Sequence, residues 1–430
     1  MVIKRLIEKI EGEAALDFQM KAGKVEDVTI RFGFYRGVEE ILKGKVPTDA
    51  LVITPRVCGI CNHAHLLSAV RALEDGYTQA GIPVTISAKA DAIREFTLSC
   101  ELIQNHMKWF YMTIVPQLER LLGEESGENH LLKASYLSST ITKALAIFAG
   151  QWPHSSYAVP GGVTCDPTYV DVMQAESLLD ESIRFFEQMV TGMAFERYLG
   201  LDQLSDLREI GGDLGRVLHL MGMHGMADMG YSHDRFIVFG SCMFSKPGKS
   251  LATTVSNVDV RYVEEYIQAG STAKGVSYKQ RLYEVGPLAR AMVAKEPMIK
   301  RLHKRYKDSL LTRVFARVHE VALLLSYAKG LLSDLRLDEP SSTLPHLPKI
   351  ANFSGTGVVE AARGSLIHNI EVKEGAISNY EIIVPTQWNL SHGTAKERGV
   401  AIEAMVGSAT PEEASFIFRT FDVCSVCTTQ

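Results

Sequence analysis

Two short stretches near opposite ends of the chain decide how it folds: residues 56–65 read RVCGICNHAH and residues 422–427 read DVCSVC. Each stretch contains a Cys-x-x-Cys pair, and nearly the whole chain lies between them. The first pair precedes apolar residues at helical spacing, which places its thiols at a helix N-terminus. Unpaired N–H groups there lower the pKa of a thiol and favour metal ligation. A soft metal shared by both pairs would require the two ends of the chain to meet.

Helical patterns fill most of the sequence between these pairs. Apolar residues recur at helical spacing over residues 88–115, 131–150, 169–198, 203–222 and 296–335. Alternating apolar residues predict β-hairpins near residues 16–32 and 365–385. We therefore expect a mainly α fold with small β hairpins, in the α+β class, built around a long central helix. No linker interrupts the pattern, so residues 1–430 are expected to form a single compact domain.

The composition excludes several classes of protein. Of the 430 residues, 46% are hydrophobic and 22% are charged, which is ordinary for a globular chain. The 45 Lys and Arg against 50 Asp and Glu leave no basic field for nucleic acid. No apolar run is long enough for a transmembrane segment, and the N-terminal stretch MVIKRLIEKIEGE has no secretory signal pattern. We therefore expect a cytoplasmic protein, or one associated with a membrane through partner subunits.

The seven cysteines leave three chemical interpretations of the two pairs open. An odd number in a long chain does not indicate a disulfide framework. A redox dithiol needs one Cys-x-x-Cys, in a small βαβ context that is missing here. A structural zinc site with four cysteine ligands usually has its pairs close together in a small domain. A buried soft-metal active centre with thiolate ligands is the interpretation that the spacing favours.

At this point the motifs resemble a known family. The patterns Arg56-x-Cys58-x-x-Cys61-x-x-x-His65 and Asp422-x-Cys424-x-x-Cys427 are similar to the two signatures of the large subunit of nickel–iron hydrogenases. Further blocks of the sequence resemble that family in the same order: residues 10–12, 36–39, 160–162, 284–290, 360–364 and 385–389. Ordered matches along most of the chain are far more specific than one Cys-x-x-Cys pair.

The resemblance implies the fold of that large subunit and the activity of a hydrogenase, an oxidoreductase that cleaves H2 heterolytically and reversibly. It implies nickel bound by Cys58, Cys61, Cys424 and Cys427. Cys61 and Cys427 would also bridge to an iron that carries carbon monoxide and cyanide. Soft thiolate ligands suit such a centre.

The resemblance also assigns roles to residues around the metals. Cys424 would accept the proton from H2, and Glu11 would relay it away. Arg363 would lie over the open metal face, where Asp422 would help to hold it. His65 would hydrogen-bond a bridging sulfur.

The chain departs from the family pattern at its C-terminus. Gln430 stands where a histidine is usual, and Val423 stands where proline is usual. The resemblance implies a magnesium ion bound by Glu39 and by a residue at the chain end. An amide oxygen is an acceptable ligand for magnesium, so Gln430 is the expected second ligand.

Electrons released from H2 must be carried away by cofactors of a partner protein if this chain has no iron–sulfur cluster of its own. Three cysteines remain outside the pairs, Cys100, Cys165 and Cys242, and they are too far apart in sequence to indicate an iron–sulfur cluster. We therefore expect an iron–sulfur small subunit, in a heterodimer or a larger assembly. The alternatives are an H2-sensing regulatory subunit with the same centre and, less favoured, a structural zinc protein.

Overall fold

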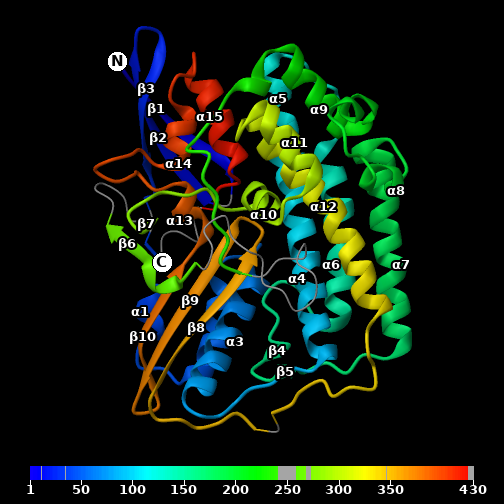
Figure 1. Cartoon of the computed structure of the whole chain (residues 1–430), viewed down its shortest axis with the longest axis vertical. Coiled ribbons are helices and arrows are strands. Elements are labelled where there is room, and N and C mark those ends of the chain that lie inside the picture. Colours follow the sequence, from blue (N-terminus) through cyan, green and yellow to red (C-terminus); the bar gives the residue numbers. More distant parts are fainter. Residues whose placement is uncertain (11, 34, 241–257, 268–272, 345, 425–430) are drawn as a thin grey trace.

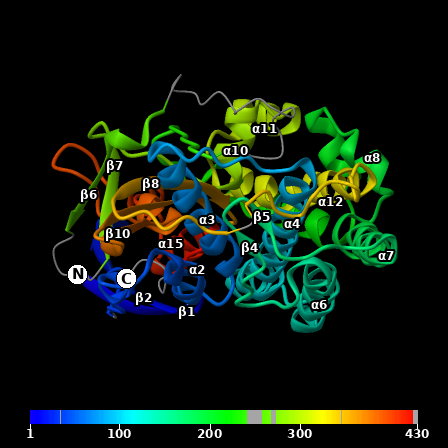
Figure 2. The same ribbon diagram turned by 90° about the horizontal axis from the view of Figure 1, so that it is seen from below.

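The structure is a computed structural model of the chain, and it describes residues 1–10, 12–33, 35–240, 258–267, 273–344 and 346–424. Helices predominate, and small antiparallel sheets accompany them. Figure 1 shows the long helices gathered on one side and most strands on the other, and Figure 2 shows the same division from below. The prediction of a mainly α fold with small β hairpins, in the α+β class, is confirmed.

The helical side is a bundle of long helices. It contains α4 (Ala88–Trp109), α6 (His130–Ala149), α7 (Tyr169–Phe185) and α12 (Leu310–Ser333). Helix α12 packs against α4 and α7, and α6 packs against the same two helices. Most residues of α12 are buried, so this helix runs through the core, as the sequence predicts for its apolar stripe.

The stripe over residues 296–335 is divided between two helices, whereas periodicity predicts one. Helix α11 spans Pro297–Tyr306, and α12 begins at Leu310. Between them Lys307 has a φ of 52°, which ends the first helix. The Ser309 side chain accepts a hydrogen bond from Thr312 N and so begins the second. The apolar spacing continues across this break, which hides it from a sequence pattern.

A sheet in the C-terminal part of the chain, called the C-terminal sheet below, has three antiparallel strands in the order β10-β9-β8: β8 (Phe353–Ala361), β9 (Gly364–Lys373) and β10 (Ala376–Ile383). The predicted hairpin is β9 and β10, and β8 was not predicted. Helix α3 (Asn62–Gln79) packs directly on β8. Gly357 allows this close approach, because a Cβ there would lie 1.9 Å from the carbonyl oxygen of Ser68. The helix that follows the first cysteine pair is thereby fixed to the sheet.

The N-terminal sheet also has one strand more than the sequence predicts. Strands β2 (Gly12–Lys21) and β3 (Lys24–Arg31) form the predicted hairpin, and β1 (Val2–Ile10) adds to β2. Alternate residues of β2 such as Leu16 and Phe18 are fully buried. The sheet lies beside α15 (Pro411–Thr420), so the first and last elements of the chain are neighbours.

The remaining helices and strands are shorter. They are α1 (Val38–Leu42), α2 (Ala50–Ile53), α5 (Val115–Leu122), α8 (Phe195–Leu199), α9 (Gly212–Met223), α10 (Pro287–Ala294), α13 (Pro385–Asn389), α14 (Val400–Met405), and the strand pairs β4 (Ala158–Val159) with β5 (Gly162–Val163) and β6 (Val263–Ile267) with β7 (Lys274–Tyr278). Single turns of 3-10 helix and two π-helical segments, Phe110–Ile114 and Phe186–Thr191, complete the order.

One large apolar cluster joins the sheets and the bundle. It includes Phe18 of the N-terminal sheet, Leu102 and Val318 of the bundle, Ile370 of the C-terminal sheet and Phe418 of α15. Such continuity is what a single domain requires, although the division into domains stays a prediction. Among the described residues, no helix is both long and apolar enough to cross a membrane.

Candidate metal centre

The first cysteine pair lies between a short 3-10 turn and a long helix. The turn Thr54–Val57 ends at Cys58, and Cys61 immediately precedes α3. The backbone N–H of Cys61 donates to the sulfur of Cys58 over 3.4 Å. The predicted position at a helix N-terminus is therefore confirmed, and its N–H groups favour the thiolate form.

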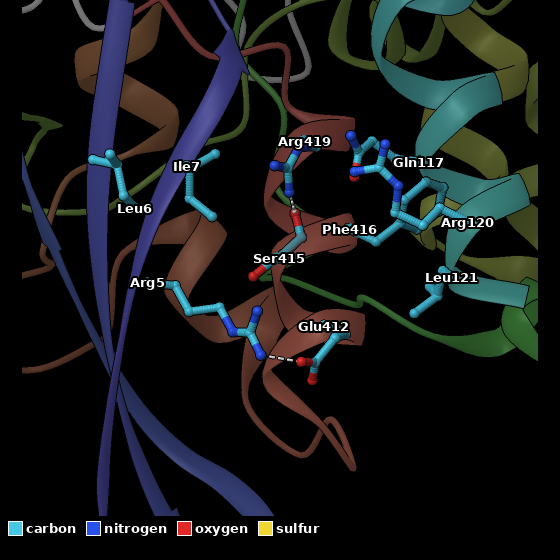
Figure 3. A pocket seen from close by; sticks show the side chains of 10 residues that line it. All are labelled: Arg5, Leu6, Ile7, Gln117, Arg120, Leu121, Glu412, Ser415, Phe416 and Arg419. Carbon is cyan, nitrogen blue, oxygen red and sulfur yellow. Dashed lines mark hydrogen bonds and ion pairs between the residues drawn. The ribbon is translucent and has the colours of Figure 1, made fainter.

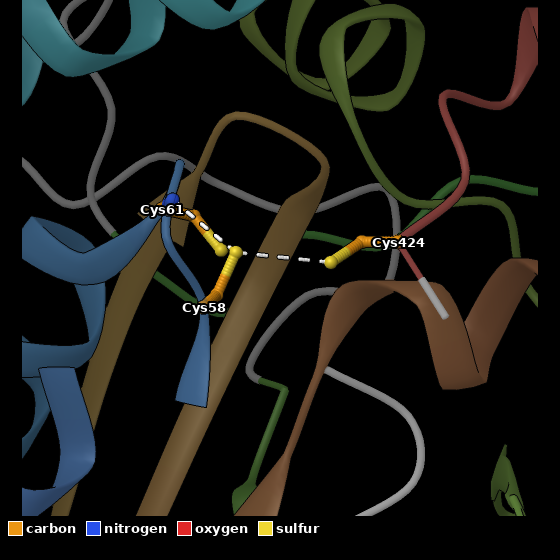
Figure 4. A group of neighbouring side chains, drawn as sticks. All are labelled: Cys58, Cys61 and Cys424. Carbon is orange, nitrogen blue, oxygen red and sulfur yellow. Dashed lines mark hydrogen bonds between the residues drawn. The ribbon is translucent and has the colours of Figure 1, made fainter. Parts of the chain in front are cut away.

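Cys424 reaches the same place from the other end of the chain. It follows α15, and its sulfur lies 3.8 Å from the sulfur of Cys58. The sulfurs of Cys58, Cys61 and Cys424 all lie within 4.8 Å of one another, and the three side chains are buried. Figure 4 shows the three sulfurs directed toward a common point. Buried thiols in this arrangement fit a nickel ion, which accepts soft ligands.

Three of the predicted site residues lie outside the residues that the structure describes. They are Glu11, Cys427 and Gln430. Their assigned roles stay predictions, as does the unpaired state of Cys242, which lies in another such segment.

Two residues of α4 hold the Cys58–Cys61 loop. The carboxyl group of Glu101 accepts from the backbone N–H groups of His63 (2.8 Å) and Ala64 (3.0 Å). Burial raises the pKa of Glu101 to about 8, although these N–H groups oppose the shift. The Asn105 side chain donates to the carbonyl oxygen of Ile60 over 2.6 Å. Both residues of α4 therefore fix the loop through its backbone.

An arginine and an aspartate predicted to belong to the site lie together beside the thiols. Arg363 donates from Nε to the Asp422 carbonyl oxygen (2.8 Å) and from Nη2 to Asp422 Oδ1 (3.1 Å). Burial opposes the charge of Arg363, but Asp422 and the three thiols outweigh it and raise the pKa of Arg363 well above its ordinary value. The guanidinium is thus held charged within the electrostatic reach of every described thiol of the site.

A buried ionic network behind this pair was missed by the sequence analysis. Arg317 donates to Asp422 Oδ2 (3.0 Å), to His106 Nδ1 (3.1 Å) and to the Ala362 carbonyl oxygen (3.1 Å). His106 Nε2 lies 2.8 Å from Glu320, which also pairs with Arg290 at 2.6 Å. All of these side chains are buried. Charged residues at helical spacing within the apolar stripe of α12 were the signal that could have revealed them.

His65 lies in the first turn of α3 and faces the C-terminal sheet. Its Nδ1 lies 3.1 Å from Nε2 of His368 on β9, and His368 Nδ1 lies 2.9 Å from the Tyr380 hydroxyl on β10. Burial lowers the pKa of His65 to about 4, so the ring is neutral at pH 7. Its predicted hydrogen bond to a bridging sulfur stays a prediction.

Glu39, the predicted magnesium ligand, has a different cation beside it. Lys274 Nζ lies 2.9 Å and 3.1 Å from the two carboxylate oxygens of Glu39, and 3.2 Å from Glu265. An ammonium group in contact with both oxygens occupies the place that a dication, which needs oxygen ligands at about 2.0–2.1 Å, would take at Glu39. The described residues around Glu39 therefore do not fit magnesium.

A separate pocket of about 380 Å³ lies between β1, α5 and α15 (Figure 3). Its lining includes Arg5, Arg120 and Arg419, and Arg5 is paired with Glu412. None of the described cysteines lines this pocket. The thiol group, not this pocket, is therefore the candidate centre.

Comparison with known proteins agrees with this geometry. The sequence profile of the family described as "Nickel-dependent hydrogenase" matches residues 36–114 and 246–430, more than half of the chain. The chain therefore belongs to the nickel-dependent hydrogenase family. It is the large, catalytic subunit of an oxidoreductase that acts on H2, and its cysteine cluster supports a centre of nickel and iron.

Individual relatives are distant but match along almost their full length. The periplasmic NiFeSe hydrogenase large subunit of Desulfomicrobium baculatum is 25% identical, over 94% of this chain and 89% of its own. Sulfhydrogenase 1 subunit alpha of Pyrococcus furiosus is 26% identical, over 98% and 96%. The solved NiFeSe hydrogenase from D. vulgaris Hildenborough superimposes with a TM-score of 0.84 at 23% identity, covering all of both chains. The comparisons do not favour the sensor or the zinc-protein alternative.

Proposed function

We propose that Cys58, Cys61, Cys424 and Cys427 hold a nickel–iron centre at which this chain cleaves H2 heterolytically and reversibly. The observation that carries the proposal is the meeting of three buried thiols, from the two ends of the chain, within 4.8 Å. When bound, the centre polarises H2 and takes up its electrons. Cys61 and Cys427 are the proposed bridges between the two metals, and carbon monoxide and cyanide are the proposed further ligands of iron.

The first proton acceptor in this proposal is the sulfur of Cys424. Its side chain is fully buried, so the sulfur is weakly solvated. A base with these properties transfers a proton over a short distance without competition from water. Glu11 is the proposed next carrier.

Arg363 is the proposed positioning group above the open face of the metals. Its two hydrogen bonds to Asp422 fix the plane of the guanidinium. Nη1 lies 3.5 Å from Asn105 Oδ1, which ties the same plane to the Cys58–Cys61 loop. A fixed, always charged donor can orient cyanide nitrogen and a developing charge without reorganising.

Electrons are proposed to leave through an iron–sulfur small subunit, as large subunits of hydrogenases generally pair with a small one. Cys58, Cys61 and Cys424 form the one metal-binding group found among the described residues, while Cys100 and Cys165 are apart from it. A second redox centre must then be supplied by another chain. Location in the cytoplasm, or beside a membrane through that partner, stays a prediction.

Infrared spectroscopy of the purified protein, with nickel and iron analysis of the same sample, tests the centre. The expected result is one nickel per chain and bands from metal-bound carbon monoxide and cyanide. Zinc in place of nickel, with no such bands, would contradict the proposal.

The proton relay has its own test in Glu11→Gln. Because an amide cannot carry the proton, H2 turnover should fall by about 10²–10⁴-fold, while the infrared bands and the nickel content stay unchanged. Glu13→Gln, an exposed substitution two residues away, is the matched control and should turn over H2 normally. Equal turnover of the two variants would remove Glu11 from the relay.

A further inference from the structure

Glu39 lies where three parts of the fold meet. It belongs to the first turn of α1, and its Oε1 accepts the backbone N–H of Ile382 on β10 over 2.8 Å. Lys274 begins β7, and Glu265 lies on the paired strand β6. The site therefore connects a helix, the C-terminal sheet and a separate hairpin through one small group of charged side chains.

Lys274 provides the positive charge at this junction. Its ammonium group contacts both oxygens of Glu39 (2.9 Å and 3.1 Å) and one oxygen of Glu265 (3.2 Å). The side chains of Glu39 and Glu265 are 11% and 19% exposed, so both carboxylates are largely withdrawn from water. Carboxylates in such a place need a cation or hydrogen-bond donors, and here one ammonium contacts both, although Oε1 of Glu265 has no hydrogen-bond partner among the described residues.

We propose that the Lys274 ammonium is a tethered replacement for the divalent cation at Glu39, so that this chain binds no magnesium there. A dication coordinated by Glu39 would have to displace Nζ from both carboxylate oxygens and would then lie beside a like charge. A monovalent group on a side chain also has no requirement for octahedral ligands.

The replacement has a consequence for stability. A bound metal ion stabilises a fold according to its free concentration, so chelators weaken such a protein. A covalently attached ammonium is present at a fixed effective concentration and cannot be removed by chelation. The junction between α1, β10 and the β6–β7 hairpin should therefore be indifferent to magnesium and to chelators, whatever reaction the thiol centre performs.

The test uses the purified enzyme with its partner and measures metal content and thermal unfolding. Samples are treated with EDTA or with millimolar MgCl2, and magnesium, calcium, manganese, iron and nickel are determined in each. The wild type is expected to hold no stoichiometric magnesium, calcium or manganese, and no iron that EDTA removes. Its unfolding midpoint should be the same in both conditions. One such hard cation per chain, with a midpoint that falls in EDTA while nickel is retained, would overturn the proposal.

Lys274→Met sharpens the test, because it removes the ammonium and keeps most of the length of the side chain. In EDTA the unfolding midpoint of this variant should lie below that of the wild type. MgCl2 should restore part of the difference, as the freed carboxylates bind the ion. Lys43→Met is the matched control: Lys43 lines the surface pocket that Glu39 and Lys274 also line, but it pairs with the exposed Glu40. It should behave like the wild type. A Lys274→Met midpoint that MgCl2 leaves unchanged would also count against the proposal, and if this variant does not fold, the wild-type measurements decide. No readout depends on H2 turnover, so failure here is distinguishable from failure of the proposed function.

Discussion

The two sides of the thiol centre are held in different ways. On one side, Cys58 and Cys61 lie in the loop that leads into α3, and Glu101 and Asn105 of α4 bind the backbone around that loop. On the other side, Cys424 follows a residue in an unusual conformation: Asp422 has a φ of 55°. Its backbone N–H donates to the carbonyl oxygen of Arg419 in α15 over 3.1 Å, and its carboxylate is fixed by two arginines.

The position of the Cys58–Cys61 loop is set largely by residues near it in sequence, whereas the position of Cys424 depends on residues from distant parts of the chain. The Cys58–Cys61 side depends on a helix start, which neighbouring residues specify, and on acceptors for backbone N–H groups. The Cys424 side depends on Arg317 and Arg363, which lie on α12 and between β8 and β9. Removing one partner of a buried ion pair lowers the free energy of unfolding much more than removing one partner of a backbone hydrogen bond. The Cys424 side should therefore be the more easily broken of the two.

The largest expected effect is that of Arg317→Met. It removes the donor to Asp422 Oδ2 and to His106 Nδ1 in a buried place and leaves Arg363 as the one arginine on Asp422, so the free energy of unfolding should fall by about 3–5 kcal/mol. Nickel content should fall as well, because Asp422 positions Cys424. Urea unfolding and metal analysis measure both. Arg71→Met is the control, since Arg71 pairs with Glu95 in a partly exposed place and should cost about 1 kcal/mol. Similar losses in the two variants would refute the asymmetry.

The sequence could predict the locally specified features of the site, but not the contacts between residues that lie far apart in the chain. The helix start after Cys61 is visible in an apolar pattern, and so is the hairpin β9–β10. The meeting of Cys424 with Cys58 could be expected from the resemblance but not from periodicity. The network of Arg317, Glu320 and His106 joins residues far apart in the chain, and no local pattern encodes such pairing. The break before α12 was missed because apolar spacing continues across it.

A smaller effect is expected from Glu101→Gln on the other side of the centre. Gln offers one acceptor oxygen, and its amide group would face an N–H donor of His63 or Ala64, so one buried donor loses its partner. The free energy of unfolding should fall by about 1–3 kcal/mol, with nickel retained because the helix start itself remains. Glu95→Gln, on the same helix and partly exposed, is the matched control. Loss of nickel in Glu101→Gln alone would show that the loop is as fragile as the Cys424 side.

The smallest effect, and the one specific to the Cys424 side, is a dependence on acid. His106 is buried and neutral: its Nδ1 accepts from Arg317 and its Nε2 faces Glu320. Burial lowers the pKa of His106 below its ordinary 6.5, with Arg317 and Arg290 acting in the same direction and Glu320 opposing. The unfolded chain then binds more protons than the folded one as the pH falls below about 6.5, so stability is lost with acid.

At about pH 5.5 this single group should cost about 1 kcal/mol relative to neutral pH. The measurement is urea unfolding at a series of pH values for the wild type and for His106→Gln. Gln can accept from Arg317 and donate to Glu320 but cannot be protonated, so its stability should decline less steeply in acid. The other buried histidines contribute equally to both proteins and cancel in the difference. Parallel pH curves would mean that His106 is not held neutral by the network, and that the Cys424 side owes its sensitivity to the arginines alone.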